Sequence, residues 1–299
     1  MNSPDNHNAL WRLDKTRICE NFAHAAATYD SAAVLQREIA NRVVERLDII
    51  RHQPACIVDL GAGTGYGTRL LEKRFPKAHV LSLDIAAPML HIARKHGSWW
   101  RRVRGLEHYV CADAEHLPLA DASADFVFSN LTLQWCQDLD RTFAECRRVL
   151  RPGGLFLFST LGPDTLKELR ASWQAVDAYA HVNLFMDMHD VGDALVRARF
   201  ADPVMDVEHL TVTYKNALEL MRELKRLGAH NAFSMRPQHL MGKQRLQAVV
   251  QAYEKFRRDG VLPATHEVVY GHAWRMEDKH PPQKNANGVV HIPLSSLKR

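Results

Sequence analysis

The stretch from residue 57 to residue 71, IVDLGAGTGYGTRLL, constrains the fold of this chain more than any other. It begins as an apolar run that contains Asp59, and Gly61, Gly63 and Gly65 then follow at alternate positions. Helical spacing of apolar residues comes next, so the stretch predicts a buried parallel strand, a tight turn and a helix. Glycines at such a turn let the backbone bend sharply and let a ligand approach without meeting a Cβ atom. The stretch therefore predicts a nucleotide-binding βα unit.

Strands and helices alternate regularly beyond this turn. Short apolar segments predict the strands, and helical spacing or a proline in a first turn predicts the helices between them. The helix at about 139–150 is expected to stop at the RPGG turn of residues 151–154. Regular βα alternation with apolar strands indicates a parallel, doubly wound α/β sheet. The predicted strands are 57–60, 78–84, 106–113, 124–130 and 154–160.

The alternation breaks beyond residue 160, where additions to the α/β domain begin. We expect residues 215–262 to form a helical lid, inserted between two strands over the carboxyl ends of the sheet. The predicted elements of this region are helices at 188–200, 216–227 and 244–256 and strands at 203–214 and 266–274. The expected organisation is an N-terminal helical arm (1–50), the α/β domain (51–214), the lid (215–262), the final strand (263–277) and a loosely ordered tail (278–299).

Composition and charge narrow the class of protein. The five cysteines are scattered without a C-x-x-C pair, which is typical of reduced thiols and predicts neither disulfides nor a metal site. The N-terminus has no apolar signal region, and no apolar run is long enough to span a membrane, so we expect a cytoplasmic protein. The formal net charge is +5, with basic clusters at 101–104, 222–226 and 257–258. Such surfaces attract acidic partners.

The glycine spacing and three aspartates decide among the ligands that a glycine turn can hold. A P-loop needs Lys followed by Ser or Thr after its last glycine, and a dinucleotide turn needs G-x-G-x-x-G, but this turn has neither. The predicted strands place Asp59, Asp84 and Asp113 at three successive carboxyl ends. Carboxylates there can accept hydrogen bonds from ribose hydroxyls and from an adenine amino group. The glycine turn and the three aspartates together fit a cationic adenosine ligand without phosphates.

With these residues the sequence resembles the class I S-adenosylmethionine-dependent methyltransferases, through VDLGAGTG, LSLD, ADAEHLPL, DFVFSNLTLQW and RVLRPGG. The resemblance implies S-adenosylmethionine as cofactor and a doubly wound Rossmann-like sheet, with an N-terminal helical arm and a helical lid inserted between the last strands. It implies Asp84 at the ribose, Asp113 at the adenine edge and Asn130 beneath the sulfonium. The implied cofactor-binding residues are Asp59, Gly61, Ala62, Gly63, Asp84, Ile85, Met89, Asp113, Ala114, Asn130 and Leu131.

A narrower resemblance extends over almost the whole chain, to the BioC family, the malonyl-[acyl-carrier protein] O-methyltransferases of biotin synthesis. The segments FAHAAATYDSAAVLQ, HVNLFMDMHDVGDALVRARFADPVMD, LKRLGAHN and VVYGHAW carry it. It implies methyl transfer from S-adenosylmethionine to the free carboxylate of a malonyl thioester on an acidic acyl-carrier protein. A malonyl carboxylate is ionised at neutral pH, so the reaction needs alignment and a dry site rather than a general base.

A buried carboxylate needs a partner until it reacts. Under this resemblance we expect Lys225 of the lid to anchor the malonyl carboxylate. Tyr29 of the arm is expected to donate its hydroxyl, and His189 is a further candidate partner. Gln134 and Trp135, which follow the fourth predicted strand, are expected to line the acyl side of the pocket.

The acceptor and the docking surface stay open from the residues alone. A methyltransferase for a quinone precursor, a small acid or a protein side chain would share the same cofactor turn, as would a non-catalytic S-adenosylmethionine-binding assembly factor. The glycine spacing argues against a nicotinamide oxidoreductase. The carrier is expected to dock on Arg222 and Arg226 of the lid or on the arginines of 101–104. We expect a monomer with no nucleic-acid or membrane partner.

Overall fold

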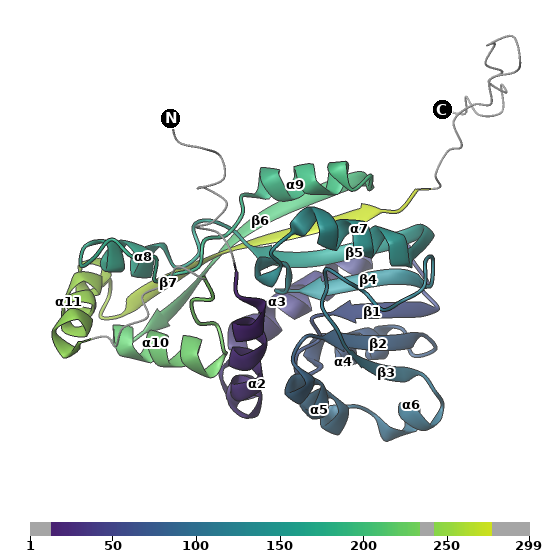
Figure 1. Cartoon of the computed structure of the whole chain (residues 1–299), viewed down its shortest axis with the longest axis horizontal. Helices are drawn as coiled ribbons and strands as arrows, with labels where there is room; N and C mark the ends of the chain where they lie inside the picture. Colours follow the sequence, from purple (N-terminus) through teal and green to yellow (C-terminus); the bar gives the residue numbers. More distant parts are fainter. Residues whose placement is uncertain (1–12, 234–241, 277–299) are drawn as a thin grey trace, which may run out of the picture.

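The seven strands of the sheet follow the order β3-β2-β1-β4-β5-β7-β6 (Figure 1). The computed structural model describes residues 13–233 and 242–276. Strands β1 to β5 pair in parallel, whereas β7 runs antiparallel to both β5 and β6. The doubly wound prediction is therefore confirmed, with an antiparallel pair added at one edge. The strands are β1 (Cys56–Leu60), β2 (His79–Asp84), β3 (Glu107–Cys111), β4 (Ala124–Asn130), β5 (Leu150–Leu161), β6 (Ala201–Tyr214) and β7 (Leu262–Trp274).

The helices fall close to their predicted positions, with two short ones that the sequence pattern did not predict. Those two are α6 and α8, of 5 and 8 residues. The predicted helix at 244–256 ends in a 3₁₀ turn rather than in α-helix, as does the second helix of the N-terminal arm. The described α-helices are α2 (Lys15–Ala32), α3 (Val34–Glu45), α4 (Tyr66–Arg74), α5 (Ala87–His96), α6 (Trp99–Val103), α7 (Leu139–Val149), α8 (Lys167–Gln174), α9 (Met188–Arg197), α10 (Ala217–Arg226) and α11 (Lys243–Tyr253).

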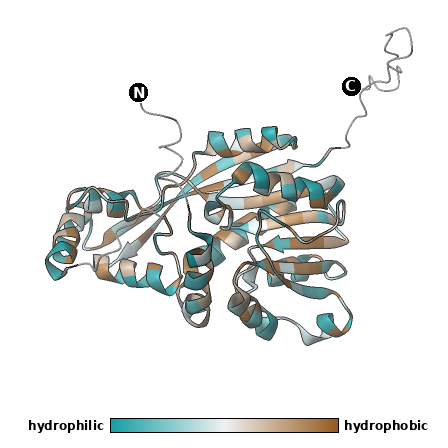
Figure 2. Cartoon of the chain, in the orientation of Figure 1, coloured by the Kyte–Doolittle hydropathy of each residue, from teal (hydrophilic) through white to brown (hydrophobic). Residues whose placement is uncertain are grey.

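The central strands are buried on both faces. Figure 2 shows them largely in the brown of hydrophobic residues. Successive side chains of a strand point to opposite faces, so Ile57 and Phe126 pack with α3 and α4, whereas Val58 and Val127 pack with α7 and α9. Burial on two faces explains why these strands are continuously apolar in the sequence.

The RPGG segment differs from its prediction. Residues 151–154 were expected to form a turn before the strand, but they belong to β5, which begins at Leu150. The register between β4 and β5 shifts between Ala124 and Phe126, and Gly153 has a φ of 78°. The Gly153 N–H donates to the Arg275 carbonyl at 2.6 Å, so these residues pair on their other side as well. The segment is a bulge that bends the strand. It is part of the strand because it pairs with residues that are distant in the sequence.

Strands β6 and β7 extend past the carboxyl ends of the other strands, where they carry α8, α10 and α11 (Figure 1). Helix α2 stands between these helices and the sheet, and the Asp14 N–H donates to the Ala232 carbonyl at 2.9 Å. The two inserted helices of the lid, α10 and α11, lie between β6 and β7 in the sequence. Within the described ranges no helix is long and apolar enough to cross a membrane. The predicted tail at 278–299 lies outside the described residues.

Candidate functional site

The glycine turn after β1 is fastened to the carboxyl end of β2. The N–H groups of Gly61 and Ala62 donate to the Leu83 carbonyl at 2.7 and 2.9 Å. The N–H of Gly63 donates to Asp84 Oδ2 at 2.9 Å. Gly61 and Gly63 have φ values of 75° and 54°, which side chains with a Cβ atom rarely adopt. The turn thus places its backbone against the space above the sheet.

Asp84 and Asp59 are both buried but occupy different positions. The Asp84 carboxylate lines a cavity and accepts the N–H groups of Gly63 and Ala86, and burial raises its pKa. The Asp59 carboxylate lies beneath the turn, where it accepts the Thr68 hydroxyl at 2.6 Å and does not line the cavity. Burial raises the pKa of Asp59 to about 7, since few groups compensate its charge. Asp59 therefore supports the turn from below.

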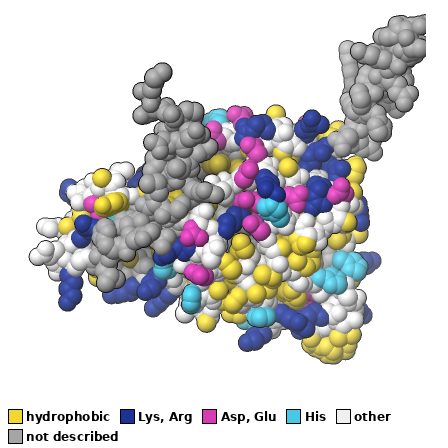
Figure 3. Space-filling view, in the orientation of Figure 1, with side chains coloured by type: hydrophobic (Ala, Val, Ile, Leu, Met, Phe, Trp, Pro, Cys, Tyr) yellow, Lys and Arg dark blue, Asp and Glu magenta, His cyan; other side chains and the backbone are white. Residues whose placement is uncertain are grey.

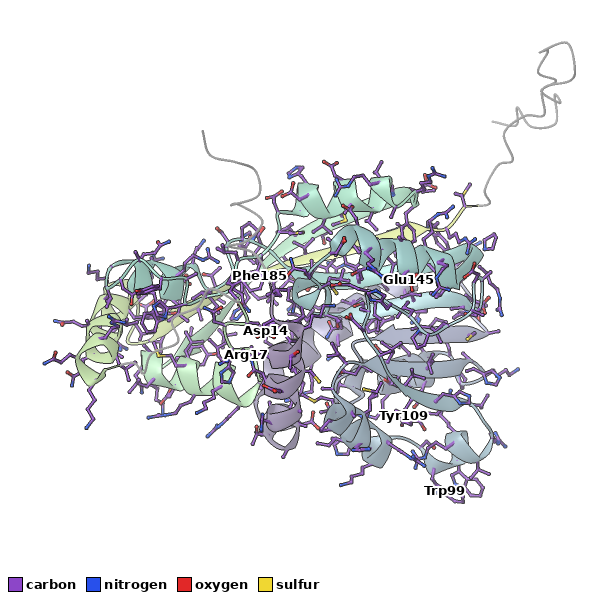
Figure 4. The ribbon with its side chains drawn as sticks, viewed as in Figure 1. Asp14, Arg17, Trp99, Tyr109, Glu145 and Phe185 are labelled. Atoms are coloured by element: carbon purple, nitrogen blue, oxygen red, sulfur yellow. The ribbon has the colours of Figure 1, made fainter. Side chains whose placement is uncertain are left out.

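A continuous cavity runs from the glycine turn to the lid at the carboxyl edge of the sheet. Its first half, which we call the cofactor half, is enclosed by the ends of β1 to β4 and by α2. Its second half, the acyl half, is enclosed by α8, α10 and residues 181–185. In Figure 4 the labelled Asp14, Arg17 and Phe185 lie in the middle of the view, between the sheet and the lid. The apolar wall of the acyl half includes Leu161, Leu169, Val182, Phe185, Leu224 and Leu227.

Most of the predicted cofactor residues line the cofactor half. Two of them, Asp59 and Ala62, are buried without lining it. The strand order puts Asp113 beyond β3, Asp84 at β2 and Asn130 at β4, so these residues succeed one another across the sheet edge. This order matches the linear order adenine, ribose, methionine. The predicted residues in the wall are Gly61, Gly63, Asp84, Ile85, Met89, Asp113, Ala114, Asn130 and Leu131.

Helix α2 covers the cofactor half and brings a cation that sequence reasoning missed. The Lys15 ammonium lies 2.6 and 2.7 Å from the two carboxylate oxygens of Asp113 and 2.7 Å from Glu115. Lys15 also lines the cavity, so the acid assigned to the adenine edge already has a partner in the arm. No local pattern signals this pairing, since 98 residues separate Lys15 from Asp113.

Two observations test whether the cofactor half fits S-adenosylmethionine. A Cβ atom added at Gly63 would meet no heavy atom within 4 Å, so a ligand can lie directly against this backbone. The Oε1 atom of Gln36, a cavity residue in the first turn of α3, is buried and has no hydrogen-bond partner among the described residues. An open glycine backbone, an orphaned acceptor and the carboxylate of Asp84 suit a cationic, hydroxyl-rich ligand.

Tyr29, Gln134 and Trp135 all line the cavity, as their predicted roles require. Burial, reinforced by the nearby carboxylate of Asp84, raises the pKa of Tyr29, so its hydroxyl stays protonated and can donate. Gln134 donates to the Leu131 carbonyl at 2.7 Å. Trp135 packs edge-on against Phe22 of α2, with ring centroids 5.2 Å apart. These contacts fix the side chains where the two halves of the cavity meet.

The structure places Lys225 and His189 outside the cavity wall. Residues 223, 224 and 227 share the face of α10 that lines the cavity, which turns Lys225 to another face. There, Lys225 lines a groove between α10 and α2 together with Arg222 and Arg226. His189 is 84% exposed at the start of α9, where its ring contacts Asp187 at 2.7 Å. The resemblance gave the motifs of these residues but not the direction of their side chains.

A methyltransferase-domain family model matches residues 58–158. A malonyl-[acyl-carrier protein] O-methyltransferase of Gallionella capsiferriformans is 51% identical to this chain, over 95% of this chain and 97% of that protein. One of Laribacter hongkongensis is 54% identical, over 88% of this chain and 90% of that protein. Both relatives thus match the arm, the sheet and the lid together.

Solved structures share the fold at low identity. The YcgJ protein of Bacillus subtilis gives a TM-score of 0.55 at 14% identity and covers 79% of this chain and 99% of its own. A phosphoethanolamine N-methyltransferase of Haemonchus contortus, solved with S-adenosyl-L-methionine, gives a TM-score of 0.52 at 17% identity. The match covers 85% of this chain and 57% of that one. These neighbours support a class I methyltransferase fold.

Proposed function

This chain belongs to the malonyl-[acyl-carrier protein] O-methyltransferase family, and from that membership we propose how its cavity carries out the reaction. The chain is an S-adenosylmethionine-dependent O-methyltransferase, and it methylates the free carboxylate of a malonyl group on acyl-carrier protein. Identity of 51% over 95% of the chain carries this conclusion, because it includes the arm and lid that enclose the acyl half. The product is a methyl ester for biotin synthesis.

In this proposal the cofactor half holds S-adenosylmethionine, which supplies an activated methyl group when bound. Asp84 accepts hydrogen bonds from the ribose, Asp113 meets the adenine edge, and the backbone at Gly61 and Gly63 lies along the ligand. Asp84 is supported by two backbone N–H groups at 2.8 and 2.9 Å, which leaves further lone pairs of its carboxylate for hydroxyls. We assign Asn130 to the methionine side, because it ends β4.

The acyl half orients the malonyl group and excludes water. The malonyl carboxylate is already ionised, so the protein contributes alignment and desolvation rather than proton removal. Tyr29 lies where the halves meet, and we assign its hydroxyl as a donor to the carboxylate. The apolar side chains of α8 and α10 then surround the thioester. Methylation removes the negative charge, which lowers the cost of keeping the group in apolar surroundings.

The carrier protein would dock on the basic face of the lid. Arg222, Lys225 and Arg226 are exposed and border the groove between α10 and α2, and Figure 3 shows dark-blue side chains along this lower left edge. The alternative cluster on α6 lies at the opposite side of the view, where Figure 4 labels Trp99. Its Arg101 is also paired with Glu72 at 2.9 Å. An acidic carrier is attracted to exposed surface cations near the cavity.

A methyl-transfer assay tests the function. Purified protein and S-adenosylmethionine with a labelled methyl group are incubated with malonyl-acyl-carrier protein, malonyl-coenzyme A or free malonate. We expect base-labile label on the malonyl group of the carrier, at a kcat/KM above that for either other acceptor. Transfer to a quinone precursor or to protein side chains, with no label on malonyl thioesters, would contradict the proposal.

A further inference from the structure

The acyl half has few side chains that can meet a negative charge. Among the described residues of the cavity wall, those able to carry a positive charge are Lys15, His181 and His266. Lys15 lies at the cofactor end and is held by Asp113 and Glu115. Burial lowers the pKa of His266 to about 4, so this imidazole is neutral near pH 7. His181 is left, among these three, as the side chain of the acyl half that can meet a negative charge.

His181 is held in a fixed orientation by two neighbours. Its Nε2 lies 2.8 Å from Oδ1 of Asp177, four residues earlier in the sequence. Its ring stacks on Trp173, with centroids 3.7 Å apart and planes inclined by 14°. The imidazole is therefore restrained about both of its torsions, and only 13% of the side chain is exposed.

Asp177 is equipped to stabilise a positive charge on this ring. Its side chain is 9% exposed and also accepts the Tyr179 N–H at 3.0 Å, with Arg245 at 3.7 Å. Burial acts to raise the pKa of Asp177, but the hydrogen bonds from Tyr179 and His181 outweigh it and lower the pKa. The Asp177 carboxylate accepts a hydrogen bond from Nε2 of this ring at 2.8 Å, which leaves Nδ1 as the ring nitrogen for a ligand.

We propose that His181, oriented by Asp177, binds the malonyl carboxylate through Nδ1 and so selects malonyl over uncharged acyl groups. This inference rests on the proposed function and adds to it the residue that recognises the substrate charge. Because Nε2–H donates to Asp177, Nδ1 is an acceptor in the neutral ring and becomes a donor only when it takes up a proton. The bond is charge-assisted with the substrate and weaker with the neutral ester, which favours product release.

The test compares carriers that differ only in the carboxylate. Malonyl- and acetyl-acyl-carrier protein are titrated into protein saturated with S-adenosylhomocysteine, and affinities are measured by calorimetry. His181→Phe keeps an aromatic ring on Trp173 but removes both nitrogens. We expect it to weaken malonyl-carrier binding by at least about tenfold, with acetyl-carrier and S-adenosylhomocysteine binding unchanged. Asp177→Asn should weaken malonyl-carrier binding in the same direction but less.

A matched control is His209→Phe, because His209 lies 3.7 Å from Asp164 but outside the cavity wall. It should leave the preference for malonyl unchanged. If wild-type protein shows no preference for malonyl-carrier, the proposed substrate is wrong. If wild type has the preference and His181→Phe or Asp177→Asn keeps it in full, the role of His181 is wrong and the function stands. Should His181→Phe fail to fold, Asp177→Asn decides alone.

Discussion

A Cβ atom added at Gly61 would lie 1.9 Å from Oγ1 of Thr132, the hydroxyl that donates to the Leu60 carbonyl at 3.1 Å. The glycine turn after β1 is thus packed against the segment that follows β4. Gly63, two residues on, faces open space and meets no heavy atom within 4 Å. Two glycines of one motif are therefore required for different reasons, Gly61 for packing of the protein and Gly63 for approach of the ligand.

Alanine at these two positions should separate stability from binding. Gly63→Ala places a Cβ atom in the cofactor half, so we expect cofactor affinity to fall at least about tenfold while unfolding free energy falls by roughly 1–2 kcal/mol from the positive φ. Gly61→Ala adds a steric clash to the same strain and should lower the unfolding free energy further. Urea unfolding and calorimetry with S-adenosylhomocysteine measure both quantities. Wild-type affinity in Gly63→Ala would contradict this assignment.

Asp59 should make the stability of the protein depend on pH. Its folded pKa of about 7 exceeds the usual unfolded value, so the folded state binds a proton more tightly. The resulting stabilisation is complete below about pH 4 and is lost as pH rises to 7, at up to about 1.4 kcal/mol per pH unit. Asp59→Asn removes this contribution, so the variant lacks the loss of stability that wild type shows as pH rises. The unfolding free energy of the variant minus that of wild type should therefore increase between pH 5 and pH 8.

Urea unfolding at these two pH values measures the difference for Asp59→Asn. Asp193→Asn, on the exposed face of α9, is the control and should follow wild type at both. Parallel curves for wild type and Asp59→Asn would mean that Asp59 is already ionised in the folded protein.

Gln36 should contact the methionine part of the cofactor. Its backbone carbonyl accepts Asn130 Nδ2 at 3.1 Å, so the residue lies beside the end of β4, and its buried Oε1 has no hydrogen-bond partner among the described residues. The ammonium group of the cofactor would satisfy this acceptor. Gln36→Met should therefore weaken the binding of S-adenosylmethionine and of S-adenosylhomocysteine by about tenfold. 5′-Methylthioadenosine lacks the amino-acid part and should bind unchanged.

Calorimetry with the three ligands distinguishes contact from disruption. Asp84→Asn is the comparison variant. The ribose is common to all three ligands, so this substitution should weaken the binding of all three. Equal losses for 5′-methylthioadenosine and S-adenosylmethionine in Gln36→Met would show that the substitution acts on the protein structure instead.

Reversing the charges of Arg222 and Arg226 to Glu should raise the KM for malonyl-carrier by about tenfold or more, because docking to an acidic carrier loses attraction and gains repulsion. Cofactor affinity should not change. The control exchanges two exposed cations outside both candidate docking clusters, Lys73 and Lys95, for Glu and so makes the same change of net charge. Steady-state kinetics at two salt concentrations provide the measurement. An equal rise of KM in the control would refute a specific docking face.

The sequence by itself determined the elements and the cofactor turn. Helical and strand periodicity, the glycine spacing and the aspartates at three strand ends are local patterns, because backbone hydrogen bonding and burial act over a few residues. The βα alternation predicted a parallel, doubly wound sheet. These patterns predicted Asp59, Asp84 and Asp113 at one edge of the sheet, and the family resemblance added Asn130. Asp84, Asp113 and Asn130 line the cavity, whereas Asp59 does not.

Only the tertiary structure decided which side chains face the cavity. The lid motif contains Lys225 and the 181–190 segment contains two histidines, yet packing of α10 on α2 turns Lys225 outward, and stacking on Trp173 holds His181 rather than His189 at the cavity. The pairing of Lys15 with Asp113 likewise spans 98 residues. Which side chain faces the cavity depends on contacts between segments that are distant in the sequence. A rotation of one helix by about 100°, the angle between successive residues, would turn a different side chain toward the cavity.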